Sequence, residues 1–240
     1  MSRQLLSRSL SRYPTVCLLA LASACVLVVP AHAGTLTTTP GRVIFPGNSS
    51  GQVGPFGSNP APNNDGGSTP SANRISVQVF ANSSGLMDIE FNVADSGGVT
   101  EYLVSQAWFN LTGQDWTGFR FELGFGVGTS FQRSGAGDFL SFDLDNVGPL
   151  AGSPRLPQVT QDFDTLDFGG GLVSGPAPLP MGFTIDVPDG LAAWNPEGQN
   201  RFTLRQMPVL AAVPEPASAA LLLAGVLGVA GLVGQRRRRA

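Results

Sequence analysis

The stretch MDIEFNV, residues Met87–Val93, alternates apolar and polar side chains at every position. Successive side chains of an extended chain point to opposite sides, so its four apolar residues share one face and its three polar residues the other. RISVQVF (74–80) and FRFELGF (119–125) repeat this period of two. The three stretches predict β-strands with one buried and one solvated face.

Other stretches around these three have the composition of strands. Gly, Pro and Asn clusters separate them, and no internal stretch has a helical period. Several short strands with polar outer faces are typical of a sandwich. We therefore predict an all-β fold, a single antiparallel β-sandwich resembling a jelly roll, over residues 74–212. Its further predicted strands are TEYLVSQAWFNLT (100–112), DFLSFDLD (138–145), GFTIDVP (182–188) and RFTLRQM (201–207).

The segment before the predicted sandwich, residues 34–73, has a different composition. A short strand at RVIF (42–45) is followed by a stretch rich in Gly, Pro, Asn and Ser that runs to Asn73. Such a stretch buries too little apolar surface to offset the entropy of ordering it. It predicts a long surface loop or flexible segment.

The N-terminus has the pattern of a secretory signal peptide. Arginines at positions 3, 8 and 12 precede an apolar core over 16–29, and Ala31 and Ala33 stand before Gly34. This pattern predicts a signal helix and cleavage after residue 33. A lipoprotein-type cleavage before Cys25 is the alternative, although the apolar core continues beyond that cysteine.

Removal of residues 1–33 limits the chemistry of the exported chain. Cys17, Cys25 and His32 all lie in the leader, and the chain has no lysine. Disulfides, zinc sites and catalysis by imidazole, thiol or amine are therefore excluded, which leaves carboxylate chemistry or calcium. Residues 34–213 carry seven arginines against sixteen acidic residues. An acidic surface disfavours nucleic acid as a partner.

Acidic residues form the first group of candidate site residues. Asp143 and Asp145 share a strand face, so they are weak candidates for calcium, although the spacing does not fit a helix-loop-helix calcium loop. The simpler interpretation is a solvated strand face, and we expect no metal and no cofactor. A pair of carboxylates would be needed for glycoside hydrolysis. The candidates are Asp138, Asp143, Asp162 and Asp164.

Tryptophans form the second group. Trp108, Trp116 and Trp194 are candidates for stacking against a sugar, because a flat ring with a polar edge suits a carbohydrate face. Aromatic residues belong to the core more often than to a site. The pattern leaves both interpretations open.

The C-terminus has three parts in order. The motif Val213, Pro214, Glu215 and Pro216 comes first, an apolar stretch at 217–234 follows, and Arg236, Arg237, Arg238 and Arg239 end the charged tail. Eighteen residues span about 27 Å as a helix, which matches the hydrocarbon thickness. Arginines stay on the cytoplasmic side, so the tail predicts a transmembrane helix with the preceding domain outside. The prolines hold Glu215 in an extended, accessible stretch.

This tail, residues 213–240, resembles a PEP-CTERM sorting signal. The resemblance implies recognition by an exosortase, a membrane protein thought to act as a cysteine transpeptidase, in bacteria that make exopolysaccharide. The inner-membrane anchor would then be transient. The same tail is sometimes labelled an ice-binding protein C-terminal domain, but the threonine run occurs only once, at 35–39, so we expect no such activity.

The sequence thus predicts a non-enzymatic β-sandwich with no catalytic residues, delivered to the cell surface or to an exopolysaccharide-containing biofilm matrix. Two alternatives remain open. The domain is a carbohydrate-binding or carboxylate-dependent carbohydrate-active protein, or the chain keeps its tail and stays a permanently membrane-anchored periplasmic domain.

Overall fold

The computed structural model describes residues 35–54, 73–143 and 153–212. These ranges form two sheets and two short 3-10 turns, η1 (Gly128–Ser130) and η2 (Leu191–Ala193). The seven-stranded sheet runs in the order β1 (Thr35–Ile44), β4 (Met87–Ala94), β12 (Arg201–Leu210), β6 (Trp116–Phe125), β10 (Thr165–Gly169) and β9 (Gln158–Gln161), with β7 (Gln132–Arg133) also paired to β6. The five-stranded sheet runs β2 (Ser50–Val53), β3 (Arg74–Ala81), β5 (Val99–Asn110), β11 (Pro178–Pro188) and β8 (Ser141–Phe142).

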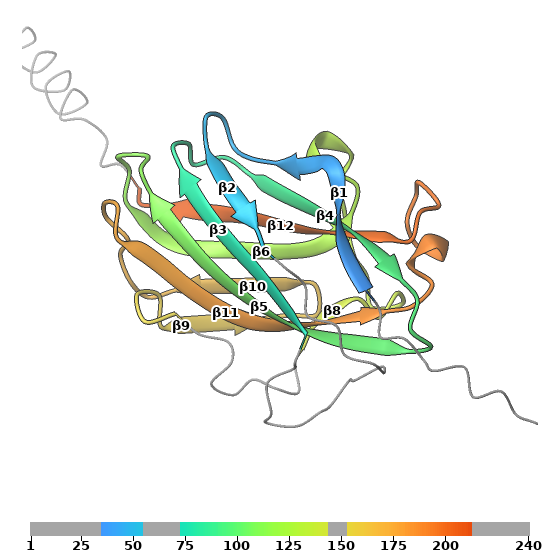
Figure 1. The fold of residues 1–240 in the computed structure, drawn as a ribbon. Coiled ribbons are helices and arrows are strands. Elements are labelled where there is room, and N and C mark those ends of the chain that lie inside the picture. Colours follow the sequence, from blue (N-terminus) through green and yellow to red (C-terminus); the bar gives the residue numbers. More distant parts are fainter. Residues whose placement is uncertain (1–34, 55–72, 144–152, 213–240) are drawn as a thin grey trace, which may run out of the picture.

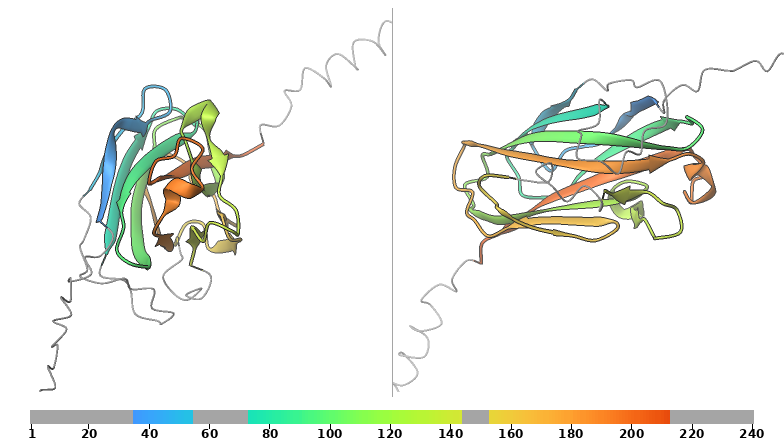
Figure 2. Two further views of the ribbon diagram at one scale, coloured as in Figure 1. Left: turned by 90° about the vertical axis from the view of Figure 1, so that its right-hand side faces the viewer. Right: turned by 90° about the horizontal axis from the view of Figure 1, so that it is seen from below.

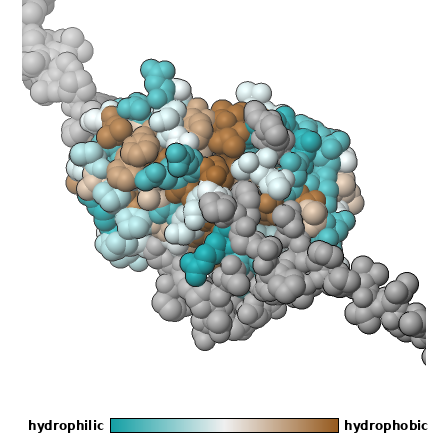
Figure 3. Space-filling view, viewed as in Figure 1, coloured by the Kyte–Doolittle hydropathy of each residue, from teal (hydrophilic) through white to brown (hydrophobic). Residues whose placement is uncertain are grey.

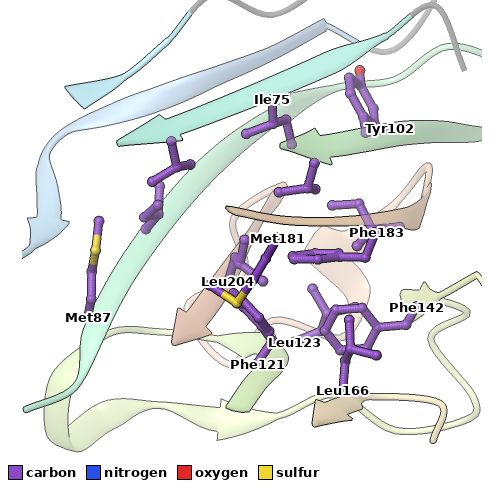
Figure 4. Close-up of a cluster of buried hydrophobic side chains, with 14 of the residues drawn as sticks. Ile75, Met87, Tyr102, Phe121, Leu123, Phe142, Leu166, Met181, Phe183 and Leu204 are labelled. Atoms are coloured by element: carbon purple, nitrogen blue, oxygen red, sulfur yellow. The ribbon is translucent and has the colours of Figure 1, made fainter. Parts of the chain in front are cut away.

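The two sheets pack face to face around one apolar core (Figure 2). Phe121 of β6 meets Phe183 of β11, with ring centroids 4.6 Å apart, and Phe119 meets Trp108 of β5 at 4.7 Å. Leu123, Leu166 and Leu204 of the seven-stranded sheet belong to the same core (Figure 4). The predicted mostly-β fold with two sheets is confirmed.

The prediction of an antiparallel sandwich is wrong for one pair of strands. β3 and β5 are parallel, with Arg74 opposite Leu103 and Ala81 opposite Asn110. The reason lies in the connection, because β4 follows β3 and belongs to the other sheet. The chain therefore returns along the seven-stranded sheet before β5 begins, and β5 runs in the same direction as β3.

The sandwich begins before residue 74, which is its predicted start. β1 pairs with β4 in one sheet and β2 pairs with β3 in the other, and Leu36 is part of the core. The strand predicted at 42–45 is the end of the longer β1, and part of the predicted loop is β2. β2 has no fully buried side chain, and its sequence SGQV does not alternate apolar and polar residues. It is a strand because its backbone pairs with β3, and sequence alternation does not reveal such pairing. Residues 55–72 lie outside the described residues.

The acidic region after β6 also differs from its prediction. Within the strand predicted over 138–145, β8 covers Ser141–Phe142, Asp138 lies in the turn before it, and residues 144–145 lie outside the described residues. β9 and β10 form a hairpin that the sequence did not predict. β10 alternates half-buried and buried residues over only five positions, which is too short a pattern to distinguish from a loop.

Tyr102 of β5 is fully buried, and burial raises its pKa to about 12, an effect that a hydrogen bond with the Leu36 backbone opposes. The unfolded chain has the ordinary value near 10. Because the folded state holds this proton more tightly, we expect stability to fall as pH rises from about 10 through 12. Absorbance at 295 nm reports the ionisation of Tyr102, because the other tyrosine, Tyr13, lies in the predicted leader. Residues 34–213 contain no lysine or cysteine that would ionise in the same pH range.

The control for this titration is Tyr102→Phe. Its midpoint of urea unfolding should change less between pH 9 and pH 12 than that of the unaltered protein. Ionisation of Tyr102 near pH 10 in the folded protein would contradict the expected shift.

Candidate functional site

The outer face of the seven-stranded sheet holds a buried ion pair. Arg205 of β12 donates from Nε and Nη2 to the two oxygens of Asp88 on β4, both at 2.8 Å. Nη2 also donates to the Gly128 carbonyl, and the guanidinium lies 3.8 Å from the ring centroid of Phe131. Asp88 is 2% exposed, although the alternation of β4 predicts a solvated side chain. The loop after β6 covers this carboxylate, because the Gly128 N–H donates to it.

A second buried carboxylate, Glu90, lies two residues further along β4. Arg42 of β1 donates to both of its oxygens, and Arg201 of β12 lies 3.4 Å from one of them. Arg42 also pairs with Glu197, and its hydrogen bonds to Glu90 and then Glu197 raise the pKa of Arg42 above its ordinary value. Because β4 lies between β1 and β12, arginines from both neighbours neutralise its polar face.

Two more arginines of this sheet form partly exposed ion pairs. Arg120 forms two hydrogen bonds of 2.7 Å with Asp167, directly opposite it on β10. Arg133 lies 3.1 Å from Asp164 and 3.9 Å from Glu122. Five of the seven arginines between residues 34 and 213 are thus engaged with carboxylates of the fold. This charged face stabilises the sheet, and its arginines are already paired with protein carboxylates.

The aromatic candidates separate into two kinds. Trp108 and Trp116 are 0% exposed and pack in the core with centroids 6.2 Å apart, so the prediction that they stack against a sugar at the surface is wrong. They point inward because both lie on the apolar face of their strands. Trp194, after η2, is 52% exposed and lies over Gly137, and its contact with a sugar stays a prediction.

The acidic candidates have local partners. Asp138 accepts hydrogen bonds from the Ser134 hydroxyl and from the N–H groups of Gly135 and Leu140. Asp143 accepts one from the Thr184 hydroxyl at 3.4 Å. Among the described residues, no group of three or more carboxylates has an arrangement that could hold a metal. Asp145 lies outside them, so the calcium pair of Asp143 and Asp145 stays a prediction.

Two other acidic candidates flank the β9–β10 hairpin turn. Asp162 accepts a hydrogen bond from the Phe163 N–H, and Asp164 binds the Thr165 hydroxyl besides Arg133. Each carboxylate therefore has a partner within its own turn or on a neighbouring strand.

Sequence reasoning missed a groove on the outer face of the five-stranded sheet. It is open, has a volume of about 390 Å³, and lies over β2, β3, β5 and β11 (Figure 3 views this sheet from outside). None of its lining residues is charged. The lining exposes more apolar than polar surface, and its exposed polar side chains are Gln52, Ser76, Gln78 and Ser105. Gly54, Val77, Gln106, Ala107 and Pro180 complete the lining.

An aromatic pair lies on the same two strands as the centre of this groove. Phe80 and Phe109 are directly opposite each other on β3 and β5, with ring centroids 4.8 Å apart and planes inclined by 17°. Phe80 follows Gln78 on the same outward face and is exposed. The polar positions of RISVQVF indicated an outward face, but the strand order that joins them to Gln52 and Ser105 could not be read from the sequence.

The predicted signals at both ends of the chain lie outside the described residues. These are the cleavage residues Ala31, Ala33 and Gly34, the motif Val213–Pro216, the span 217–234 and the arginines 236–239. The predicted signal helix lies outside them as well. Within 35–54, 73–143 and 153–212, no helix is long and apolar enough to cross a membrane.

Comparison with protein families identifies the tail. Residues 212–239 match the family model of the PEP-CTERM protein-sorting motif. This β-rich chain therefore carries a PEP-CTERM sorting motif, which implies export, sorting at a membrane and recognition by an exosortase. No curated protein and no solved structure matches the chain significantly. The β-rich domain in front of the tail thus has to be interpreted from its own geometry.

Proposed function

We propose that this protein is a non-enzymatic component of an extracellular matrix, which an exosortase releases from the inner membrane by cleavage at Val213–Pro216 and which then binds neutral exopolysaccharide. The observation that carries the proposal is the match of residues 212–239 to the sorting motif, directly after a β-rich domain with an uncharged groove. Its final location would be the cell surface or the biofilm matrix.

The chemistry of the groove supports a polysaccharide partner. Gln52, Gln78 and Ser105 offer both donors and acceptors, which is what hydroxyl groups of a sugar require. A lining without charge favours a neutral chain over a polyanion. The Phe80–Phe109 pair adds an apolar surface near the groove, suited to the apolar face of a sugar ring.

A structural role for the acidic residues supports a non-enzymatic function. Asp138 is held by three donors within its own loop, and the arginines of the seven-stranded sheet are paired with carboxylates. General acid-base catalysis needs a carboxyl group in reach of substrate. The groove lining includes none.

Binding to the host's own polysaccharide tests the proposal. The processed protein recovered from the matrix is titrated against the neutral fraction of exopolysaccharide from the same culture, with alginate as the polyanionic comparison. We expect saturable binding to the neutral fraction. Replacing Gln52 and Gln78 together with alanine should weaken it about tenfold, because each hydrogen bond contributes roughly 0.5–1.5 kcal/mol.

Gln132→Ala/Gln158→Ala is the matched control, since these exposed glutamines lie on strands of the other sheet. It should bind as the unaltered protein does. Release of reducing sugar from the neutral fraction would refute the non-enzymatic role, and preference for alginate would refute the neutral ligand.

A further inference from the structure

Three segments lie together at the end of the sandwich from which the tail leaves. They are the turn 110–115 between β5 and β6, the loop 170–177 between β10 and β11, and the end of β12 with the two residues after it, 209–212. We call these segments the tail-side end. In Figure 1 they lie together at the upper left, where the red end of β12 meets the green and orange loops.

Hydrogen bonds hold the three segments against one another. Trp116 exchanges backbone hydrogen bonds with Val173, and the side-chain amide of Asn110 donates to the carbonyls of Gln114 and Val173. The Ala211 N–H donates to the Asp115 carbonyl at 2.9 Å. The tail-side end is thus one continuous surface of the fold.

Exposed apolar side chains gather on this surface. Leu111, Leu172, Val209 and Leu210 are each between 41% and 53% exposed. Each leucine comes from a different segment and is next in sequence to a residue that makes one of these hydrogen bonds. Leu111 follows Asn110, Leu172 precedes Val173, and Leu210 precedes Ala211. A cluster of large apolar side chains that the fold leaves uncovered is typical of an interaction site.

Charge is distributed unequally between the two ends. The three segments of the tail-side end contain one charged residue, Asp115. At the opposite end, the loops 95–98 and 189–200 contain Asp95, Asp189 and Glu197 and no basic residue, and of these three Glu197 is paired with Arg42 of β1. An anionic headgroup layer repels carboxylates and accepts apolar side chains, so it would favour the tail-side end over the opposite one.

The tether between the folded domain and the apolar stretch is short. Ala211 is hydrogen-bonded to Asp115 in the turn before β6, and Ala217 begins the predicted span six residues later. Six extended residues reach at most about 21 Å. While the tail is in the membrane, the tail-side end therefore stays within about 21 Å of the point where the predicted span begins.

We infer that the tail-side end rests on the lipid surface of the membrane that holds the uncleaved tail, with Leu111, Leu172, Val209 and Leu210 inserted at the boundary between headgroups and acyl chains. This inference rests on the membrane stage of the proposed function. The domain then holds Val213–Pro216 at the height of the interface, where a membrane-embedded sorting enzyme acts. Release of the tail frees the domain from the surface.

A fluorescent label at the tail-side end tests the inference. The chain without its predicted leader, residues 34–240, contains no cysteine and is reconstituted in vesicles of phosphatidylethanolamine and phosphatidylglycerol. A single cysteine is introduced by Leu172→Cys. The matched label is Ala192→Cys, an exposed site in η2 at the opposite end. Both carry a polarity-sensitive dye, and quenching by a doxyl group on the lipid acyl chain is measured.

We expect quenching at position 172 to exceed that at position 192 several-fold. Equal quenching at the two positions, with the protein bound to the vesicles, overturns the inference and leaves the sorting proposal standing. A blue shift at position 172 without lipid quenching would assign the surface to contact with a second copy of the chain, and also overturns the inference. Failure of residues 34–240 to bind vesicles refutes the membrane stage itself.

Discussion

Replacing Arg205 with methionine is expected to lower the free energy of unfolding by about 3–5 kcal/mol, because it leaves the Asp88 carboxylate buried without its cation. Both oxygens of Asp88 bind the guanidinium, which also donates to the Gly128 carbonyl and covers the ring of Phe131. Methionine keeps part of the side-chain volume and isolates the loss of charge. Urea unfolding followed by tryptophan fluorescence measures the change.

Arg120→Met is the matched control. Its pair with Asp167 has hydrogen bonds as short as those of Arg205, but the two side chains are 44% and 32% exposed. Solvent screens such a pair, so its loss should cost no more than about 1 kcal/mol. Similar losses for the two variants would contradict the conclusion that burial of Asp88 determines the effect.

The second large effect is expected in the tail. Changing Pro214, Glu215 and Pro216 to alanine should abolish release, so that the protein accumulates in the membrane fraction and disappears from the matrix. Proline is excluded from helix interiors and alanine favours them, so the three alanines let the helix of the predicted span extend to residue 214 and remove the extended stretch. Immunoblots of membrane, periplasmic and matrix fractions of the native host measure the distribution.

The domain itself supplies the control for this variant. Pro196 and Glu197 form a Pro-Glu pair in the exposed loop after η2, and the length of β12 separates this loop from the tail. Pro196→Ala/Glu197→Ala loses the partly exposed contact with Arg42 and should be sorted as the unaltered protein is. Matrix delivery of the Pro214–Pro216 variant at the normal level would show that this motif is not the sorting signal.

Much of the fold could be predicted because it depends on local alternation. β3, β4 and β6 coincide closely with RISVQVF, MDIEFNV and FRFELGF. The parallel pairing of β3 with β5 could not be predicted, because it depends on β4 joining the other sheet. The burial of Asp88 and Glu90 was missed for a related reason. Alternation shows that a face is polar, whereas neighbouring strands and loops decide whether that face meets water.

The candidate sites also differ in whether the local sequence or the fold defines them. The sorting tail is a linear motif, so its residues identify it without a fold. The groove joins Gln52, Gln78 and Ser105 from three strands, and only the sheet order brings them together. Trp108 and Trp116 were candidates by residue type, but the apolar face of their strands places them in the core. The tail-side end likewise depends on three loops that are distant in sequence.

The central claim is that the chain is sorted and cut at its C-terminal motif, and the intact mass of the protein from the native host tests it most directly. Cell envelope and culture matrix are extracted separately, and the C-terminus of each species is assigned from its mass. Our account predicts a matrix species that ends within Val213–Pro216, with any transferred acceptor as added mass there. A matrix or surface species that retains Arg236–Arg239 would contradict it.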